Sequence, residues 1–360
     1  MLIYILVILL ILLMQSSLSG MEAGPNRDKT EIRYLKIVCW VLVILAALRG
    51  ITVGTDTHGY WPDYLSMSNR SFLEVLSQYA DYPGYYLLAK TCSLLHLPVQ
   101  ILFGIVEGVY VYAFYLFIKR YSSNKLYSIL GFMTIGLYAF SLAGLKQVLS
   151  MAFILLGYMA LDAKKYWQSV LLLVVAYFCH HVSLIFLAGV AIYFMRNTKY
   201  YYLYLVITVA VVLLGSQFLW GEMLSLLDND HYSELYTSDE GYSSTSMIIY
   251  GVLLGILFIF SGRYRRLMPV ESKIMLGMST LAFALQEFSF ISSAAFRLSF
   301  FFLPFMIVAF PNAFNCISNR EIRWWVRIGV EVILIFIFVY TNRNGGSIVP
   351  YKFFWQQGLQ

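Results

Sequence analysis

The chain has 360 residues, of which 60% are hydrophobic and only 12% are charged, and its mean hydropathy is +0.72. Because soluble domains carry about 25% charged residues, this composition excludes a soluble globular protein and indicates a protein embedded in a membrane. The formal net charge of +6 comes from short basic clusters between apolar runs, a pattern typical of membrane topology signals that gives no indication of nucleic-acid binding. The cysteines stand singly, so we expect no disulfide and no metal centre.

The first expected element is an apolar helix at residues 2–19. This segment lacks the basic start and the A-x-A-like cleavage site of a signal peptide, so we expect it to be retained as a membrane span. Further apolar stretches follow it at residues 36–52, 98–118, 126–144, 147–162, 167–180, 182–195, 200–220, 247–262, 274–292, 297–315 and 324–341. The sequence therefore predicts an all-α, polytopic integral membrane protein, with one transmembrane domain over residues 1–360 and about 12 membrane-spanning helices, within a range of roughly 10 to 14.

Basic residues determine the expected topology. They cluster between apolar stretches, at residues 27–36, 119–125, 164–165, 196–199, 263–273 and 320–327. The positive-inside rule places these clusters in the cytoplasm. Residues 53–97 and the acidic segment 221–246, which has no Lys or Arg, are then extracytoplasmic loops, and both termini are predicted to be extracytoplasmic.

The loop at residues 53–97 contains two features of interest. Residues 82–96 form an apolar segment too short to cross a bilayer comfortably, so we expect an outer-face or re-entrant helix. The loop begins with GTDTHGYWPDYLSM, a mixture of carboxylates and aromatic rings suited to holding sugars, since carboxylates accept hydrogen bonds from hydroxyl groups and aromatic faces stack on sugar rings. A solvated turn that caps the next segment is the alternative. The candidate sugar-binding residues here are Asp56, His58, Asp63, Tyr60 and Trp61.

Three cations lie at or near the outer edge of apolar segments: Lys146, Arg297 and Arg49. A cation at such a depth is costly unless it faces protein, water or an anion. Lys146 and Arg297 have small neighbours, which favour a cavity, whereas Arg49 is as consistent with a side chain that snorkels to the interface. These three residues are candidate anion-binding groups.

Two further candidates are a histidine pair and an acidic residue within apolar sequence. His180 and His181 adjoin at a predicted outer junction, where a neutral imidazole can act as a general base near physiological pH, although a structural role is the commoner one for a lone histidine. Glu287, which follows Gln286 in an apolar stretch, is either a functional group or the partner of an arginine such as Arg297.

Several segments resemble the EpsG-like, Wzy-type bacterial polysaccharide polymerases. The block LKQVLSMAFILLGYMALDAKKYWQSVLLLVVAYFCHHVSLIFL resembles the family's signature of an Arg-Gln pair, a basic turn and a Phe-His-x-Ser-like junction. GTDTHGYWPDY, DYPGYYLL, AAFRLSFFFLPFMI and IVPYKFF resemble its other elements in the expected order. Lys146 stands where the family usually has Arg, which keeps the charge and loses bidentate phosphate geometry. The spacing to Ser183 favours His181 over His180.

The resemblance implies an all-helical membrane glycosyltransferase that makes an exopolysaccharide, O-antigen or capsule. It implies that oligosaccharide units carried on undecaprenyl diphosphate are joined on the outer face of the bacterial cytoplasmic membrane, without a metal or other cofactor. Partners implied are this lipid-linked substrate, membrane lipid, a flippase and a chain-length regulator. The diphosphate would bind Lys146, Arg297 and Arg49; the candidate bases are His181, His180, Asp56 and Glu287; and the candidate sugar-binding residues are Asp56, His58, Tyr60, Trp61, Tyr85 and Gln147.

Three other functions remain open from the sequence. A flippase or exporter of lipid-linked oligosaccharides would also use basic cavity residues, but these should continue to the cytoplasmic side. A membrane acyltransferase acting on polysaccharide would place its histidine near a cytoplasmic donor. A non-catalytic assembly subunit is the third alternative.

Overall fold

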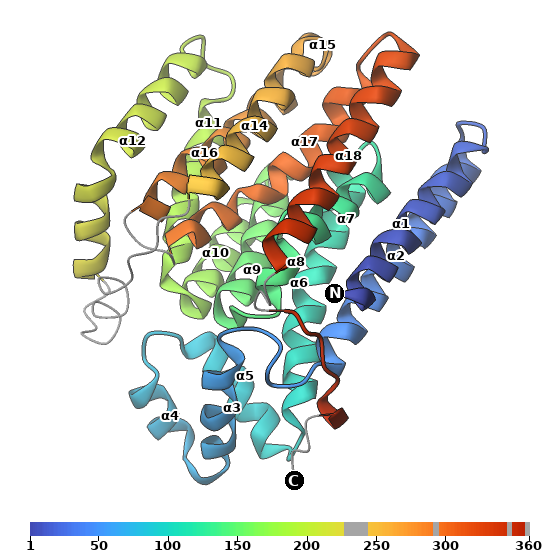
Figure 1. Cartoon of the computed structure of the whole chain (residues 1–360). Helices are drawn as coiled ribbons and strands as arrows, with labels where there is room; N and C mark the ends of the chain where they lie inside the picture. The colour runs from blue at the N-terminus through green and yellow to red at the C-terminus, as the bar shows by residue number, and fades with distance from the viewer. Residues whose placement is uncertain (227–243, 291–294, 344–347, 357–360) are drawn as a thin grey trace. The chain divides into compact units, whose positions relative to one another are not determined.

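A computed structural model describes residues 1–226, 244–290, 295–343 and 348–356 (Figure 1). Within these residues the chain is helical and has no strand, apart from an isolated antiparallel bridge between Arg49 and Phe353. The predicted all-α class is therefore confirmed. Most of the acidic segment predicted at residues 221–246 lies outside the described residues. The chain folds as two compact units, which are described separately below.

Three described helices are long and apolar enough to cross a membrane: α1 (Leu2–Ser19), α6 (Val99–Tyr121) and α9 (Leu145–Asp162). The chain is thus a membrane protein, while the count of about 12 spans stays a prediction. Apolar helical segments of 10–17 residues occupy other expected stretches: α10 (Tyr166–Cys179), His181–Met195 including α11 (Leu187–Met195), Tyr201–Gly215 of α12 (Tyr201–Leu226), Met247–Phe260 of α14 (Ser244–Phe260), and α17 (Leu303–Asn315).

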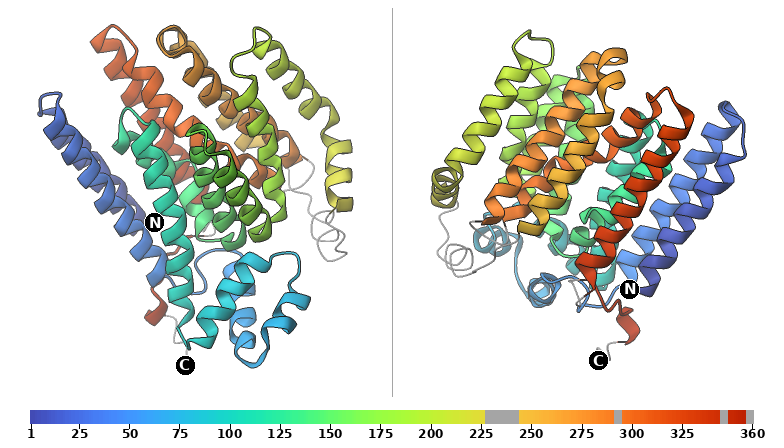
Figure 2. Two further views of the ribbon diagram at one scale, coloured as in Figure 1. Left: turned by 180° about the vertical axis from the view of Figure 1, so that it is seen from behind. Right: turned by 45° about the horizontal axis from the view of Figure 1, so that its top comes forward.

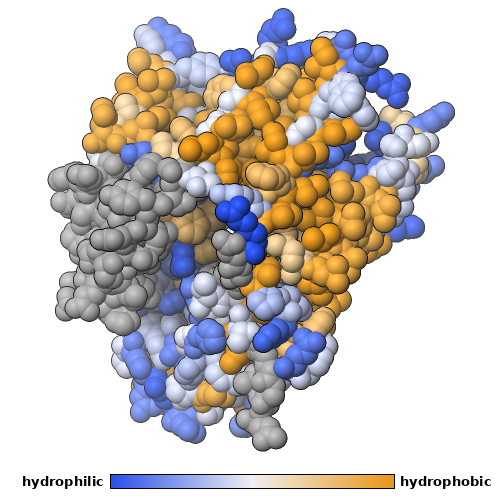
Figure 3. Space-filling model, viewed as in Figure 1, coloured by the Kyte–Doolittle hydropathy of each residue, from blue (hydrophilic) through white to orange (hydrophobic). Residues whose placement is uncertain are grey.

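The first unit contains residues Met1–Leu184 and Ile328–Gln360. It begins with a hairpin of α1 and α2 (Pro25–Leu48), whose surface is largely hydrophobic below a hydrophilic tip (Figure 3). Leu2, Leu13 and Trp40 are more than two-thirds exposed there. Lipid accepts such apolar surface at no cost, because a bilayer interior offers no water.

The core of this unit lies between α2, α6, α9 and α10. The stretch expected as one span at residues 126–144 is instead two buried helices, α7 (Lys125–Thr134) and α8 (Leu137–Ser141). Gly136 separates them with a φ of 102°, in the left-handed region that glycine adopts without a Cβ penalty. The break therefore has a local backbone cause, which hydropathy alone does not reveal.

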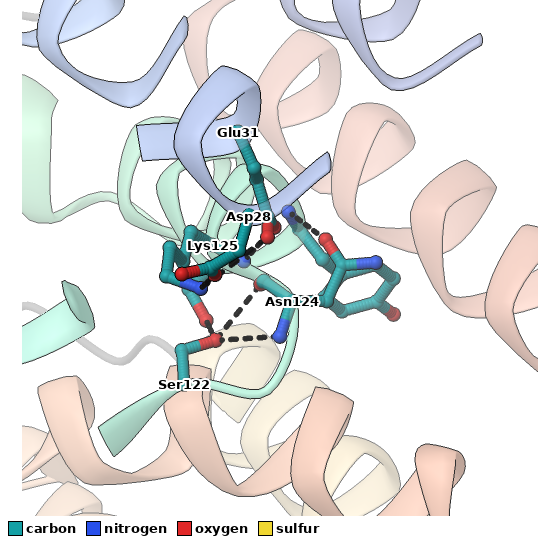
Figure 4. Close-up of polar contacts among 7 residues, drawn as sticks. Asp28, Glu31, Ser122, Asn124 and Lys125 are labelled. Atoms are coloured by element: carbon teal, nitrogen blue, oxygen red, sulfur yellow. Dashed lines mark hydrogen bonds and ion pairs between the residues drawn. The ribbon is translucent and has the colours of Figure 1, made fainter. Parts of the chain in front are cut away.

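A polar cluster fixes the start of α7 to α2 (Figure 4). Lys125 Nζ lies 2.7 Å from Asp28 Oδ1 and 3.3 Å from Glu31 Oε2. The side chain of Asn124 caps α7 by accepting a hydrogen bond from the backbone N–H of Tyr127 at 3.0 Å. Burial lowers the pKa of Lys125, and the hydrogen bonds and charges of Asp28 and Glu31 raise it by more, so that the net pKa is raised. The amine is thus held in its charged form.

The segment between α2 and α6 folds into short helices: α3 (Thr57–Ser66), η1 (Met67–Asn69), α4 (Phe72–Gln78) and α5 (Pro83–Leu94). They gather at the end of α6 where that helix begins (Figures 1 and 2). A capping box between Ser71 and Glu74 starts α4. The 12 residues of α5 span about 18 Å, well short of a hydrocarbon core of about 30 Å. Lys90 Nζ donates a hydrogen bond to Met67 O at 2.8 Å and so ties α5 to η1.

The second unit contains residues Ile185–Arg327. Its centre is α16 (Pro269–Ala284), which is mostly buried and packs against α17, α14 and α12. Two short 3-10 helices, η3 (Leu285–Phe290) and η4 (Ala295–Phe301), pack against each other beside α16. The remaining elements are α11, α15 (Gly262–Leu267) and the first eight residues of α18 (Arg320–Asn342), a helix whose other 15 residues belong to the first unit.

Candidate functional site

The centre of the candidate site in the first unit is Lys146, a partly exposed residue in the first turn of α9. Its Nζ lies 4.2 Å from the ring centroid of Tyr82, 5.5 Å from that of Tyr86 and 5.7 Å from that of Tyr60. A ring face attracts a cation electrostatically at such distances. We call Tyr60, Tyr82 and Tyr86 the tyrosine cage. It places a positive charge among aromatic faces contributed by α3, by α5 and by the residue that precedes α5.

Hydrogen bonds to Asp63 support one wall of the tyrosine cage. The hydroxyl of Tyr86 donates to Asp63 Oδ2 at 3.1 Å, and the hydroxyl of Tyr79 donates to Asp63 Oδ1 at 3.0 Å. The rings of Tyr79 and Tyr86 stack at a centroid distance of 3.8 Å. Burial raises the pKa of Tyr86 and of Tyr79, and the nearby Asp63 carboxylate raises both further. Both hydroxyls therefore stay protonated and remain donors.

The histidine pair lies beside the tyrosine cage. His180 ends α10 in an extended conformation, and His181 starts η2 (His181–Phe186). The ring centroid of Tyr82 is 5.2 Å from that of His180 and 5.5 Å from that of His181, and Tyr177 stacks on His181 at 4.7 Å. Tyr82 thus lies near both Lys146 and the two imidazoles, which brings the predicted cation and the predicted base into one neighbourhood.

Burial lowers the pKa of His181, and the Asp81 charge opposes this by raising it, with a net lowering. A lowered pKa keeps the imidazole neutral at pH 7, the form that can accept a proton. The general-base role of His181 stays a prediction from the sequence.

The close approach of α5 to the end of α10 requires a glycine. A Cβ added to Gly84 would lie 2.9 Å from Cys179 Sγ and 3.1 Å from Phe178 O. Such distances lie below normal van der Waals contact, so any side chain would push the two elements apart. The Gly84 position therefore fixes the distance between the tyrosine cage and the histidines.

The predicted sugar-binding residues occupy two kinds of position. Tyr60 and Tyr85 are buried and lie 5.3 Å apart between ring centroids, and Gln147 is buried in α9 next to Lys146. Trp61 and Asp56 are partly exposed, and His58 is exposed, at or near the start of α3. The structure therefore brings Tyr60, Tyr85 and Gln147 to the neighbourhood of Lys146, with the other three on the adjoining surface of α3.

Arg49 occupies a different environment from Lys146. It is 0% exposed, its Nη1 donates to Ala46 O at 2.8 Å, and its guanidinium lies 4.2 Å from the ring centroid of Phe103. Glu107 on α6 is the acidic group that acts on its charge, and one Glu107 oxygen accepts a hydrogen bond from Ser141 at 2.9 Å. This side chain does not snorkel to an interface, and its predicted contact with a diphosphate stays a prediction.

The C-terminal segment covers the end of α2 next to Arg49. The backbone N–H of Gly50 donates to Lys352 O at 2.9 Å, and the Tyr351 hydroxyl donates to Leu45 O at 2.7 Å. Tyr4 of α1 donates to Ile348 O at 3.2 Å. The segment resembling the family's Pro-Tyr element therefore helps to enclose the buried arginine.

Two other predicted residues belong to the second unit. Glu287 lies in η3 and Arg297 lies in η4, and both are partly exposed. The amide of Gln286 donates to the Ser299 hydroxyl, which links the two packed 3-10 helices. The structure thus places Glu287 and Arg297 on neighbouring short elements, as expected from their spacing.

Sequence reasoning assigned no role to Tyr82, Tyr86 and Tyr79, and it proposed Asp63 for sugar binding without predicting that two tyrosine hydroxyls donate to it. Tyr82 and Tyr86 are four residues apart, a spacing that puts side chains on one side of a helix, and this signal was present in DYPGYYLL. Tyr79 and Asp63 gave no such signal, because their contacts join separate short helices. Groups of three or more metal-ligating side chains placed to hold an ion are absent from the described parts of the chain.

The described site of this all-helical membrane protein thus combines a lysine among tyrosine rings with two neighbouring histidines. The chain belongs to the EpsG family, whose profile matches residues 32–353, nearly the whole chain. EpsG is a Wzy-like family of polysaccharide polymerases, so membership indicates a glycosyltransferase-like polymerase of polysaccharide biosynthesis. The resemblance noted from the sequence is thereby confirmed. No curated protein and no solved structure matches the chain.

Proposed function

We propose that this protein joins undecaprenyl-diphosphate-linked oligosaccharide units into a cell-surface polysaccharide, on the outer face of the bacterial cytoplasmic membrane. The observation that carries the proposal is the position of Lys146 in the tyrosine cage, next to His180 and His181. A fixed cation and a neutral imidazole are the two groups that transfer from a diphosphate-linked sugar requires.

The reaction follows from these two groups. The acceptor hydroxyl oxygen forms a bond to the anomeric carbon of the donor sugar while the bond from that carbon to the diphosphate oxygen breaks. The electron pair leaves with the diphosphate, whose added charge Lys146 stabilises. His181 takes the proton of the acceptor hydroxyl. A preorganised cation of this kind contributes about 3 kcal/mol, or roughly a hundredfold in rate.

The remaining predicted residues have supporting roles in the proposal. Asp56 is the alternative base, while Arg297 and Glu287 of the second unit stay sequence-based predictions as a diphosphate-binding cation and a base. Tyr60, Tyr85 and Gln147 contact sugar near Lys146, and Asp56, His58 and Trp61 contact the growing chain on the surface of α3. Arg49, being enclosed, acts on the site through its charge and through the position of α2.

The proposed location rests on the pattern of basic clusters. With those clusters in the cytoplasm, both termini and the short helices α3, α4 and α5 lie outside the cell membrane, where lipid-linked units are polymerised. A flippase that delivers the units and a regulator of chain length are the expected partners.

The test is the glycan profile of a strain that lacks this protein and carries either Lys146→Ala or Lys165→Ala. Lys165 is an exposed lysine that follows α9 and immediately precedes α10, so its variant controls for the loss of one positive charge. With both variants present in the membrane at wild-type amounts, Lys146→Ala should lose long polymer and accumulate single lipid-linked units on the outer leaflet. The Lys165→Ala strain should resemble the wild type.

Two outcomes would reject the proposal. Normal polymer length in the Lys146→Ala strain would remove Lys146 from the reaction. Units that accumulate on the cytoplasmic leaflet of the deletion strain would instead favour a lipid-linked oligosaccharide flippase.

A further inference from the structure

We infer that Asp63 is a positioning residue, which holds Tyr86 against Lys146 and thereby fixes the ammonium at the place where a diphosphate binds. The diphosphate part of this inference rests on the proposed function, whereas the positioning of Lys146 does not. Asp63 itself contacts neither Lys146 nor, in this scheme, the substrate. It acts through the hydroxyl of Tyr86.

The physical basis is a continuous series of contacts across three short helices. Arg70 Nη1 donates to the Tyr79 hydroxyl at 3.2 Å, and the Tyr79 hydroxyl donates to Asp63 Oδ1 at 3.0 Å. The second oxygen of Asp63 accepts from the Tyr86 hydroxyl at 3.1 Å, and the Tyr86 ring lies 5.5 Å from Lys146 Nζ. Asp63 is thus the one group in this series that is bonded to both tyrosines.

The geometry determines what Asp63 can hold. Both of its oxygens are used by hydroxyl donors, and a hydrogen bond to a charged acceptor is stronger than one between neutral groups. Tyr79 stacks on Tyr86 at 3.8 Å and Tyr85 meets it edge-on at 5.2 Å. These neighbours restrict the Tyr86 ring laterally, and the bond to Asp63 sets how far it turns toward Lys146.

A cage of ring faces has a chemical consequence for the lysine. Ring faces attract an ammonium ion, so the three rings restrict where the Lys146 ammonium lies. A diphosphate that enters would therefore meet a cation whose position is already set. If the Tyr86 ring were released, the flexible four-carbon stem of lysine would let the charge move.

The test measures the reactivity of Lys146 toward a small acylating reagent, using the purified full chain and mass spectrometry. The rate is compared with those of two internal controls. Lys165 is exposed and reports the reagent, whereas Lys90 is 2% exposed and held by Met67 O, so it reports local unfolding of the same short helices. The variants are Asp63→Ala, Asp63→Asn, Tyr86→Phe and the Asp63→Ala/Tyr86→Phe double variant.

Asp63→Ala should raise the Lys146 rate relative to Lys165 by about tenfold to a hundredfold, the effect of losing hydrogen bonds to a charged acceptor, while Lys90 stays slow. Tyr86→Phe keeps the ring and loses one hydrogen bond, so its increase should be smaller. The double variant should not exceed Asp63→Ala, since both changes break the same link. Asp63→Asn keeps a polar group of the same shape and should restore much of the protection.

An unchanged Lys146 rate in both Asp63→Ala and Tyr86→Phe would overturn the inference, as would a parallel rise at Lys90. The labelling needs no substrate, so its result is separate from that of the glycan profile. A changed Lys146 rate in a protein that proves not to polymerise sugar would sustain the positioning role and reject the proposed function. An unchanged rate in an active polymerase would do the reverse.

Discussion

Two ion pairs in the first unit have the same short N–O distance but differ in burial. They therefore provide a direct test of how much burial of an ion pair affects the free energy of unfolding. Lys125 Nζ lies 2.7 Å from Asp28 Oδ1, and Arg120 Nη2 lies 2.7 Å from Asp162 Oδ2. The Lys125 side chain is 10% exposed, and that of Arg120 is 41% exposed. Exposed pairs contribute about 0 to 1 kcal/mol, whereas removing one partner of a buried pair costs about 3 to 5 kcal/mol.

Lys125→Met should therefore destabilise the protein by an intermediate amount, about 1 to 3 kcal/mol, because its site is only partly buried. Arg120→Met should cost less than about 1 kcal/mol. The measurement is thermal unfolding of the purified protein in one detergent, followed by intrinsic fluorescence. Arg120→Met serves as the matched control, since it also replaces a cation by an unbranched apolar chain at the same side of the unit.

Double-mutant cycles sharpen this prediction. Asp28 is nearer to Lys125 Nζ than Glu31 is, but the Asp28 side chain is 57% exposed and that of Glu31 is 13% exposed. Water and salt screen the exposed carboxylate, so the coupling of Lys125 to Glu31 should exceed its coupling to Asp28. A larger coupling to Asp28, or an Arg120→Met variant less stable than Lys125→Met, would refute the reasoning from burial.

Three further predictions concern the candidate site. Because burial lowers the pKa of His181, its imidazole should stay neutral below the ordinary histidine pKa, and polymerase activity should fall only below about pH 6.5. A fall in activity that begins above that pH would contradict the assignment of His181 as the base. Gly84→Ala should reduce polymer output, because the new Cβ would lie 2.9 Å from Cys179 Sγ, whereas Gly59→Ala should not, because no atom lies within 4 Å of its new Cβ. Equal output from both variants would show that the close approach of α5 to α10 is unimportant for activity. In a polymer assay, Tyr82→Phe should keep most of the activity and Tyr82→Leu should lose it, since the aromatic ring 4.2 Å from Lys146 Nζ is the group that attracts the ammonium. Greater activity in Tyr82→Leu than in Tyr82→Phe would contradict this role of the ring.

Hydropathy and charge predicted the helical class and the membrane setting, because both depend on composition summed over long windows. The same reasoning treated residues 126–144 as one span, whereas the structure has α7 and α8 separated at Gly136. A single left-handed residue redirects the chain without changing the average hydropathy of the stretch. Local backbone breaks of this kind are therefore hidden from a window average.

The sequence predicted the charged and histidine residues of the candidate site, but it did not predict how the tyrosines pack around them. Lys146 and the histidine pair are polar residues in apolar sequence, and such residues are easily recognised as functional candidates. Tyr79, Tyr82 and Tyr86 are three among 29 tyrosines, and in a membrane protein most tyrosines have an interfacial explanation. Their common role depends on contacts between α3, α5 and α9, which no local pattern encodes.

The tyrosine cage gives a physical reason why a lysine can serve at position 146, where the resemblance to the family led us to expect an arginine. An arginine fixes a phosphate by its own planar fork, and a lysine presents a compact charge on a flexible stem. Three ring faces lie 4.2 to 5.7 Å from the Lys146 ammonium. These neighbouring rings limit where the ammonium can lie, whereas an arginine is limited by the planar shape of its own guanidinium. A lysine at this position therefore requires Asp63, because Asp63 holds the Tyr86 ring in place. Replacing Lys146 by arginine should for that reason make activity less dependent on Asp63, a coupling between two residues that do not need to touch each other.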